Sequence, residues 1–371
     1  MQLELFYNDQ KSIQDTKGRA DTFKVLASFV NAAPDEIVLG SASSQLFRNL
    51  TNSLRPYLNS DSEMIVSTLC HEAGISAWVS LANSVGITIK WWTPPSSSNP
   101  RLCLSTLKSL LTPKTRLVTC GHISNILGSI HPIREIADLV HTVPGALLSV
   151  DGVAWAPHRP IDVKALDVDF YTFSWYKAFG PHIAQMYARR SVQNRAMTSL
   201  NHYFLDSFSA DVKLRIGQNL YELEDCLPAI VHYINETGWD NIIAHETVLT
   251  ETLLAYLRSK PEIYTICGDT SSDPERRVSL ITFRVAGRSS EAIADEIHDT
   301  TNFRVLWGDG YSARVAYDVL KLPEDGVVRV SLVHYNTVEE VKGFIEALDT
   351  IVSKARVAKA NGANGTAEVG V

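Results

Sequence analysis

The fold is decided by the stretch VDGVAWAPHRPIDVKALDVDFYTFSWYKAFGP, residues 150–181. It holds the end of one short apolar run, ALLSVD (146–151), and the whole of a second, DFYTF (169–173), and polar residues follow each run directly. Short runs rich in β-branched and aromatic residues predict buried strands. Ligands of open α/β sheets bind at the carboxyl ends of the strands, so Asp151 and residues 174–177 are the first candidates for a functional site.

Similar runs recur on both sides of this stretch. Between about residues 20 and 190 they alternate with longer amphipathic segments, which is the rhythm of repeated βαβ units and a mostly parallel sheet. We therefore predict an α/β fold with a large domain over residues 16–240. The expected strands are 36–39, 63–68, 86–92, 115–120, 146–151, 169–173 and 183–188, and the expected helices are 44–56, 73–84, 103–111 and 131–141.

The pattern changes towards the carboxyl end of the chain. Residues 219–259 predict two or three helices with a break at Gly238. The runs RVSLITFRV, NFRVLWG and GVVRVSLVHY and a final helix at 337–355 predict a smaller α+β domain over residues 241–356. The small, polar and glycine-rich residues 357–371 predict a disordered tail.

Composition restricts the classes of function. The net charge is −7 over 371 residues with no long run of Lys and Arg, which argues against a nucleic-acid partner. No run of about 18 apolar residues occurs, and residues 1–15 lack the apolar core of a signal peptide, so no membrane segment is expected. The five cysteines form neither a CxxC pair nor a cluster with histidine. We therefore expect no disulfide framework, no metal site and a cytoplasmic location.

Further polar residues follow the other expected strands. Gly40 and the small residues 41–44 open a helix, where backbone N–H groups can bind an anion such as phosphate. His71 follows the strand at 63–68, and Asn125 follows the strand at 115–120. Taken singly, each of these residues favours an ordinary structural role as a helix cap, a turn residue or a solvated side chain.

The combination is more specific than its members, because one cofactor needs all of these groups together. Pyridoxal phosphate needs a lysine amine that forms an imine with its aldehyde, an acid beside its ring nitrogen, and a flat group against the ring. It also needs a donor for the ring oxygen and a site for the phosphate. The acid matters most, because a carboxylate paired with the ring nitrogen keeps the ring protonated and makes it an electron sink.

The segment 150–181 also resembles the class V aminotransferase and cysteine desulfurase-like group of fold-type I pyridoxal phosphate enzymes. Within that group it is very similar to fungal, cysteine desulfurase-like enzymes that carry out a decarboxylative aldol reaction. The resemblance implies a fold-type I α/β architecture, bound pyridoxal 5'-phosphate and a homodimer. The likeness covers about residues 20–355 and includes STLCHEAGISAW (67–78), TPKTRLVTCGHISNILGSIHPIREIADLVHTVPG (112–145) and VVRVSLVHYNTVEEV (327–341).

By motif, the resemblance assigns roles to individual residues. Lys177 in SWYKAFGP would be the catalytic lysine that forms the imine, and Asp151 would pair with the pyridine nitrogen. His71 would stack on the ring, and Asn125 would reach the ring oxygen. Arg329 would bind the substrate carboxylate, for which a bidentate guanidinium is suited, although without the resemblance it is an ordinary surface arginine of a strand. The phosphate would be held by Ala42, Ser43, Ser174 and Tyr176.

The chain departs from the family pattern at several positions. Cysteine desulfurases carry a nucleophilic cysteine on a loop before the final strands, but FRVLWGDGYSARVAYD (303–318) contains none, so persulfide formation is not expected. Ala154 stands where many relatives have glutamine, and Tyr176 stands where desulfurases have histidine. Relatives supply a threonine from the partner subunit to the phosphate, and the nearest match here is Gln218.

The resemblance implies a pyridoxal phosphate-dependent lyase or transferase. Its expected substrates are an amino acid and an aldehyde acceptor, and the expected reaction joins L-aspartate to the aldehyde with loss of carbon dioxide, giving a γ-hydroxy amino acid in fungal secondary metabolism. Relatives carry a further N-terminal segment that residues 1–15 do not resemble, so a shortened, catalytically impaired cofactor-binding paralogue is an alternative. A C–S lyase and an amino-acid epimerase also stay open, because both begin with loss of the same Cα proton.

Overall fold

The computed structural model describes residues 10–95, 98–217 and 220–364, without the side chains of residues 10–17 and 355–364. The described chain divides into two compact units. The large unit contains residues 10–95, 101–124 and 130–241, and the small unit contains residues 98–100, 125–129 and 242–364. Sequence pattern alone assigns 98–100 and 125–129 to the large domain, because it cannot detect their contacts with residues far along the chain.

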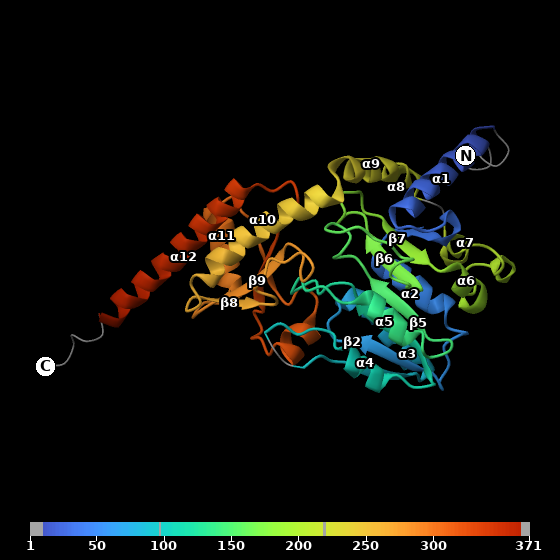
Figure 1. The fold of residues 1–371 in the computed structure, drawn as a ribbon, viewed down its shortest axis with the longest axis horizontal. Helices are drawn as coiled ribbons and strands as arrows, with labels where there is room; N and C mark the ends of the chain where they lie inside the picture. The colour runs from blue at the N-terminus through green and yellow to red at the C-terminus, as the bar shows by residue number, and fades with distance from the viewer. Residues whose placement is uncertain (1–9, 96–97, 218–219, 365–371) are drawn as a thin grey trace. The chain divides into compact units, whose positions relative to one another are not determined.

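The large unit is built on a seven-stranded sheet in the order β1-β7-β6-β5-β4-β2-β3. Neighbouring strands from β3 through β6 run parallel, whereas β7 is antiparallel to both β6 and β1. This mixed but mainly parallel sheet confirms the predicted α/β fold (Figure 1). Its strands are β1 (Ile37–Gly40), β2 (Glu63–Ser67), β3 (Thr88–Trp92), β4 (Thr115–Gly121), β5 (Leu147–Asp151), β6 (Phe170–Ser174) and β7 (Ala184–Ala188).

Helices connect the strands, as expected for βαβ units. The first part of the unit has α1 (Gln10–Phe29), α2 (Ser43–Ser53), α3 (Glu72–Val85), α4 (Leu104–Leu110) and α5 (Ile133–Val140), with the short 3-10 helix η2 (Pro34–Glu36). After β7 come α6 (Arg190–Ala196), η3 (Tyr203–Leu205), α7 (Ala210–Leu214), α8 (Tyr221–Glu224), α9 (Leu227–Thr237) and α10 (Trp239–Arg258).

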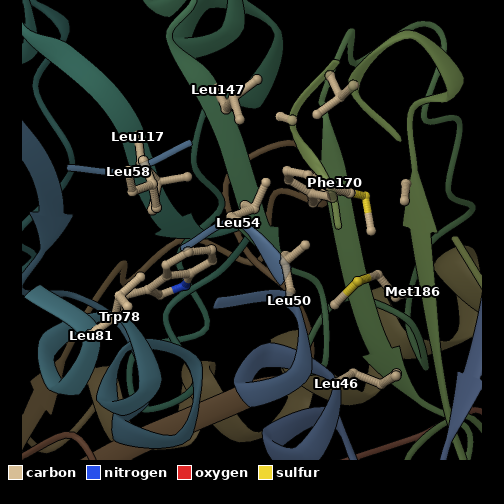
Figure 2. Close-up of a cluster of buried hydrophobic side chains, with 14 of the residues drawn as sticks. Leu46, Leu50, Leu54, Leu58, Trp78, Leu81, Leu117, Leu147, Phe170 and Met186 are labelled. Atoms are coloured by element: carbon tan, nitrogen blue, oxygen red, sulfur yellow. The ribbon is translucent and has the colours of Figure 1, made fainter. Parts of the chain in front are cut away.

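The core of the large unit lies between the sheet and the helices α2 and α3. On α2, leucines recur at helical spacing at positions 46 and 50, and Leu54 follows at the C-cap, so that one side of the helix is apolar. Figure 2 shows these leucines, with Trp78 of α3, facing Leu117, Leu147, Phe170 and Met186 of the sheet. Removing one such side chain, as in Leu50→Ala, would cost about 2–5 kcal/mol of stability. This packing holds the first turns of α2 and α3 in place.

The small unit has a four-stranded antiparallel sheet in the order β10-β11-β9-β8. Its strands are β8 (Tyr264–Cys267), β9 (Leu280–Val285), β10 (Leu306–Gly308) and β11 (Val327–Ser331), and its helical segments are most of α10, α11 (Ser290–Thr300), the π-helical η4 (Arg314–Val319) and α12 (Val338–Asn364).

The last helix is longer than the sequence indicates. α12 continues past residue 357, where a disordered tail was expected, and ends at Asn364. Alanine, lysine and arginine in its last turns are good helix formers, which offsets the weak glycine and asparagine positions. Residues 365–371 lie outside the described part of the chain. No helix among the described residues is long and apolar enough to cross a membrane.

Candidate active site

Strand register brings several predicted site residues of the large unit to one edge of the sheet. Gly121 at the end of β4 pairs with Asp151 at the end of β5, and Asp151 pairs with Thr172 of β6. Further along, both Ser174 of β6 and Gly40 of β1 pair with the same residue of β7, Ala184. The ends of β4, β5, β6 and β1 therefore lie along one edge, which is the usual ligand-binding edge of such a sheet.

Asp151 is the acid at the centre of this edge. Its Oδ1 accepts a hydrogen bond of 2.9 Å from the backbone N–H of Val153, which closes a tight turn after β5. Burial raises the pKa of the carboxyl group, and the bond from Val153 and the positive charge of Lys177 oppose that rise. The charged form of Asp151 is thus destabilised in the folded chain, and a cation close to it would stabilise that form.

The first turn of α3 packs directly against this carboxylate. A Cβ atom at Gly74 would lie 2.6 Å from Asp151 Oδ2, so only glycine allows this close approach. His71 is the N-cap of the same helix, and its Nδ1 accepts a bond of 3.0 Å from the backbone N–H of Ala73. This bond fixes the imidazole in the tautomer with its proton on Nε2 and sets the plane of the ring.

Lys177 lies in a tight turn after β6. Its N–H donates to the carbonyl of Ser174 over 3.2 Å, and Phe179 two residues later has a φ of 68°, in the left-handed region where residues other than glycine are uncommon. The turn is anchored by Trp175, which is fully buried and donates from Nε1 to Gln185 Oε1 over 3.2 Å. Lys177 is therefore presented by a rigid segment beside Asp151.

Two features next to Lys177 suit an anion. The Oγ of Ser174 is buried and has no hydrogen-bond partner in the described chain. Helix α2 begins after Ala42, which has no side-chain acceptor for the first-turn N–H groups, so the N–H groups from Ser43 onward are not capped by it. Tyr176 is exposed and stacks on His182, with ring centroids 5.1 Å apart and an interplanar angle of 5°.

The other two predicted residues belong to the small unit, where they are joined by hydrogen bonds. Asn125 donates from Nδ2 to the carbonyl of Gly310 over 2.8 Å and accepts at Oδ1 from the buried Ser312 hydroxyl over 2.8 Å. Arg329 of β11 donates from Nη1 to the carbonyl of Asn125 over 3.1 Å. Its Nε is buried without a hydrogen-bond partner in the described chain, and burial lowers its pKa. Arg329 is thus a partly buried donor and not a surface arginine.

The described thiols differ in reactivity. Burial raises the pKa of Cys70 to about 12 and that of Cys267 to about 11, so both stay protonated. Cys103 is the exception, because hydrogen bonds from Ser105 and Thr106 lower its pKa to about 7. It belongs to the large unit and precedes α4, so it is not the loop thiol of a desulfurase.

Comparison with known proteins identifies the family of the chain. A family model described as aminotransferase class V matches residues 10–344. The chain belongs to the aminotransferase class V family. It is 53% identical to the cysteine desulfurase-like protein ustD of Aspergillus flavus over 93% of this chain and 80% of that protein. It is 55% identical to the nonribosomal peptide synthetase-like enzyme fsqF of Aspergillus fumigatus over 94% of this chain but only 24% of that enzyme.

The fold comparison gives the same result. The apo structure of the cysteine desulfurase from Thermococcus onnurineus superimposes with a TM-score of 0.83 at 23% identity, covering 94% of this chain and 86% of that one. The fold is therefore that of the fold-type I pyridoxal phosphate enzymes, and the family depends on pyridoxal phosphate.

The residues of this chain fit that cofactor. Ser174 supplies a buried hydroxyl without a partner in the described chain, and the uncapped start of α2 supplies N–H groups for a phosphate. Asp151 has a buried carboxylate that could pair with a protonated ring nitrogen, and Lys177 has an amine that could bind the aldehyde. Gln218 lies outside the described residues.

The residues that support Asp151 and Asn125 were not predicted from the sequence. Gly74 gives room to Asp151, and Ser312 orients the Asn125 amide. A glycine directly after the His71-Glu72-Ala73 helix start was a usable signal for close packing. Nothing in the sequence indicated Ser312, because its partner is 187 residues away.

Proposed function

We propose that this chain is a pyridoxal phosphate-dependent lyase or transferase that adds L-aspartate to an aldehyde with loss of carbon dioxide, giving a γ-hydroxy amino acid in fungal secondary metabolism. The observation that carries the proposal is the juxtaposition of Lys177 and Asp151, together with a segment 303–318 that contains no cysteine. The first feature supports carbon-acid chemistry on an amino acid. The second disfavours the sulfur transfer of desulfurases.

The chain's own groups have distinct roles in holding the cofactor. When bound, pyridoxal phosphate stabilises negative charge at the Cα atom of an amino-acid substrate. The Asp151 carboxylate would hold the ring nitrogen, and His71 would lie against the ring. An amide nitrogen carries two hydrogens, so the bond from Asn125 to Gly310 leaves it able to donate to the ring oxygen. The phosphate would be held by Ala42, Ser43, Ser174 and Tyr176.

Lys177 and Arg329 act on the substrate itself. The Lys177 amine would remove the Cα proton, a step that a positioned base accelerates by about 10²–10⁴-fold. Arg329 would hold the α-carboxylate through Nε and Nη, keeping the Cα–H bond aligned. The β-carboxylate of aspartate leaves as carbon dioxide, and its Cβ forms the new bond to the aldehyde carbon. The aldehyde oxygen takes up a proton and becomes the γ-hydroxyl.

In the experiment, the purified protein is loaded with pyridoxal phosphate and incubated with L-aspartate and, in turn, each of a series of aromatic and aliphatic aldehydes. Mass spectrometry is expected to show the γ-hydroxy amino acid, and carbon dioxide should form in equal amount. L-Cysteine should release little sulfide and leave no persulfide on the protein. Alanine alone, or a D-amino acid, would contradict the aldol reaction and indicate simple β-decarboxylation or epimerisation.

We also propose that the working form is a homodimer, as the family resemblance implies. Light scattering of the cofactor-loaded protein should give twice the chain mass of 41.0 kDa. A monomer that retains full activity would contradict this.

A further inference from the structure

A second group of buried polar side chains lies beside Asp151 and has no role in the chemistry above. His122 and Tyr171 are 4% and 1% exposed, and His122 Nδ1 lies 2.7 Å from the Tyr171 hydroxyl oxygen. The His122 ring also stacks on Trp155, with centroids 3.7 Å apart and an interplanar angle of 9°. The buried His122 and Tyr171 are therefore in contact with each other, and the partly exposed Trp155 covers the His122 ring.

This group encloses the turn that carries Asp151. The backbone N–H of His122 donates to the carbonyl of Asp151 over 2.8 Å, and that of Gly152 donates to Thr172 over 2.8 Å. The Tyr171 ring lies against Gly152 so closely that a Cβ there would be 2.1 Å from a ring carbon. Tyr171 therefore spans from β6, across the end of β5, to the residue after β4.

The pair lies on the opposite face of the sheet from the Asp151 carboxylate. Phe170 belongs to the core beneath α2 and α3, and side chains alternate along a strand, so Tyr171 faces the other way. The Asp151 carboxylate contacts Gly74 of α3, on the α3 side. Tyr171 and His122 thus contact the turn from the face of the sheet opposite the Asp151 carboxylate, and they do not lie in the site.

Neither His122 nor Tyr171 carries a charge in the folded chain. Burial, with some help from His131, lowers the pKa of His122 well below its usual value. Burial also raises the pKa of Tyr171, with the charge of Asp151 adding to the effect. The phenol therefore keeps its proton and the imidazole is neutral, so the two groups share a hydrogen bond and the pair adds no charge next to Asp151.

We propose that Tyr171 and His122 are positioning residues for Asp151, and that their hydrogen bond holds the turn of residues 151–153 so that the carboxylate keeps the orientation it needs toward the cofactor's ring nitrogen. The inference rests on the role proposed above for Asp151. It predicts that loss of the bond weakens the interaction with the ring nitrogen and leaves the phosphate contacts of Ser174 unchanged.

The test measures binding to cofactor-free protein, with no amino acid present. The probes are pyridoxal phosphate and its 1-deaza analogue, in which CH replaces the ring nitrogen. Tyr171→Phe should lower the affinity for pyridoxal phosphate about fivefold, the worth of one ordinary hydrogen bond, and leave the affinity for the deaza analogue unchanged. Tyr187→Phe is the matched control, because Tyr187 is the buried tyrosine paired directly across from Tyr171 on β7. It should change neither affinity.

The outcomes separate positioning from general stability. Equal loss for both probes would show a merely structural role and overturn the inference, as would no loss for either. Should Tyr171→Phe fail to fold, His122→Phe keeps a ring on Trp155, cannot form the hydrogen bond to Tyr171, and should give the same selective loss. If Asp151→Ala also changes the affinity for the two probes equally, the role proposed for Asp151 is wrong, and the inference that depends on it is wrong too. Selective loss in Asp151→Ala without loss in Tyr171→Phe overturns the inference alone.

Discussion

The polar groups at the two ends of strands β5, β6 and β7 differ in whether they have partners within the chain. At the end where β6 begins, Asp169 accepts from the backbone N–H of Leu148 over 2.8 Å and lies 3.0 Å from His141 and 3.2 Å from Arg189. At the other end, Ser174 Oγ is buried with no partner in the described chain, and Asp151 has a raised pKa.

The difference separates a structural cluster from a ligand site. In a structural cluster, each buried charge is paired with residues of the same chain, because an unpaired buried charge costs free energy. In a ligand site, some buried polar groups have no partner until the ligand binds, which lowers the stability of the free protein. Substitutions at the two ends should therefore have opposite patterns of effect on activity and on folding.

The largest effect is expected for Lys177→Ala at the site end. Loss of the amine should remove the yellow absorbance of the bound cofactor and lower turnover by about 10³-fold or more. The free energy of unfolding should change far less than turnover does, because the turn is anchored by the buried Trp175. Lys164→Ala, at an exposed lysine, is the control for loss of one positive charge. An unchanged spectrum in Lys177→Ala would remove the central assignment.

A matched pair of Asp→Asn substitutions tests the comparison directly by urea unfolding of cofactor-free protein. Asp169→Asn should cost about 1–3 kcal/mol, because Arg189 and His141 lose their buried partner and keep only the more exposed Asp167. Asp151→Asn should cost nothing and instead add up to about 1 kcal/mol, since the raised pKa of Asp151 means that its charge opposes folding at neutral pH. Equal losses at the two positions would contradict the distinction.

Ser174→Ala should lower the affinity for pyridoxal phosphate while leaving folding intact. The hydroxyl has no partner in the described chain, so its removal breaks no internal hydrogen bond. One charge-assisted bond to a phosphate is worth about 1.5–3 kcal/mol, which should appear as weaker cofactor binding in an absorbance titration. Ser149→Ala removes a similar buried, unpaired hydroxyl from β5 and should leave cofactor affinity unchanged.

The strands of this fold were predictable because each is a local apolar run. All the strands expected in the large unit occur within a residue or two of their predicted bounds, and the polar residues that follow β5 and β6 do lie at one edge. The antiparallel direction of β7 was not predicted, although the nine residues from Trp175 to Ile183 that connect it to β6 are too few for the crossover that parallel neighbours need.

Within the site, local motifs located the chemistry but not its supports. Asp151 ends β5 and Lys177 lies three residues after β6, so the local pattern alone was enough to propose them. The Tyr171–His122 bond was not, since the two residues are 49 apart in the sequence and each is individually an ordinary member of a strand or loop. Nor did the sequence place Asn125 with Ser312 and Arg329, because those contacts join parts of the chain about 200 residues apart.

The smallest predicted effect concerns the pH dependence of the structural end. The hydrogen bond to Asp169 and the charges of Asp169 and Asp167 raise the pKa of His141, while burial and Arg189 oppose the rise. The folded chain therefore binds this proton more tightly than the unfolded chain. The resulting stability is complete below the unfolded value of about 6.5 and is lost as the pH rises through the higher folded value.

His141 should thus contribute up to about 1 kcal/mol of stability that is lost as the pH rises from about 6 through its folded pKa. The lowered pKa values of His122 and His131 act in the opposite direction over this range. The contribution is therefore measured by urea unfolding as the difference between the wild type and His141→Gln, which should decrease as the pH rises. His232→Gln, at an exposed histidine paired with Glu236 on α9, should show no such difference from the wild type, because exposed ion pairs contribute little. If the difference between the wild type and His141→Gln does not decrease over this range, the charge pairing assigned to this end of the strands is wrong, and the contrast with the Asp151 end loses its electrostatic basis.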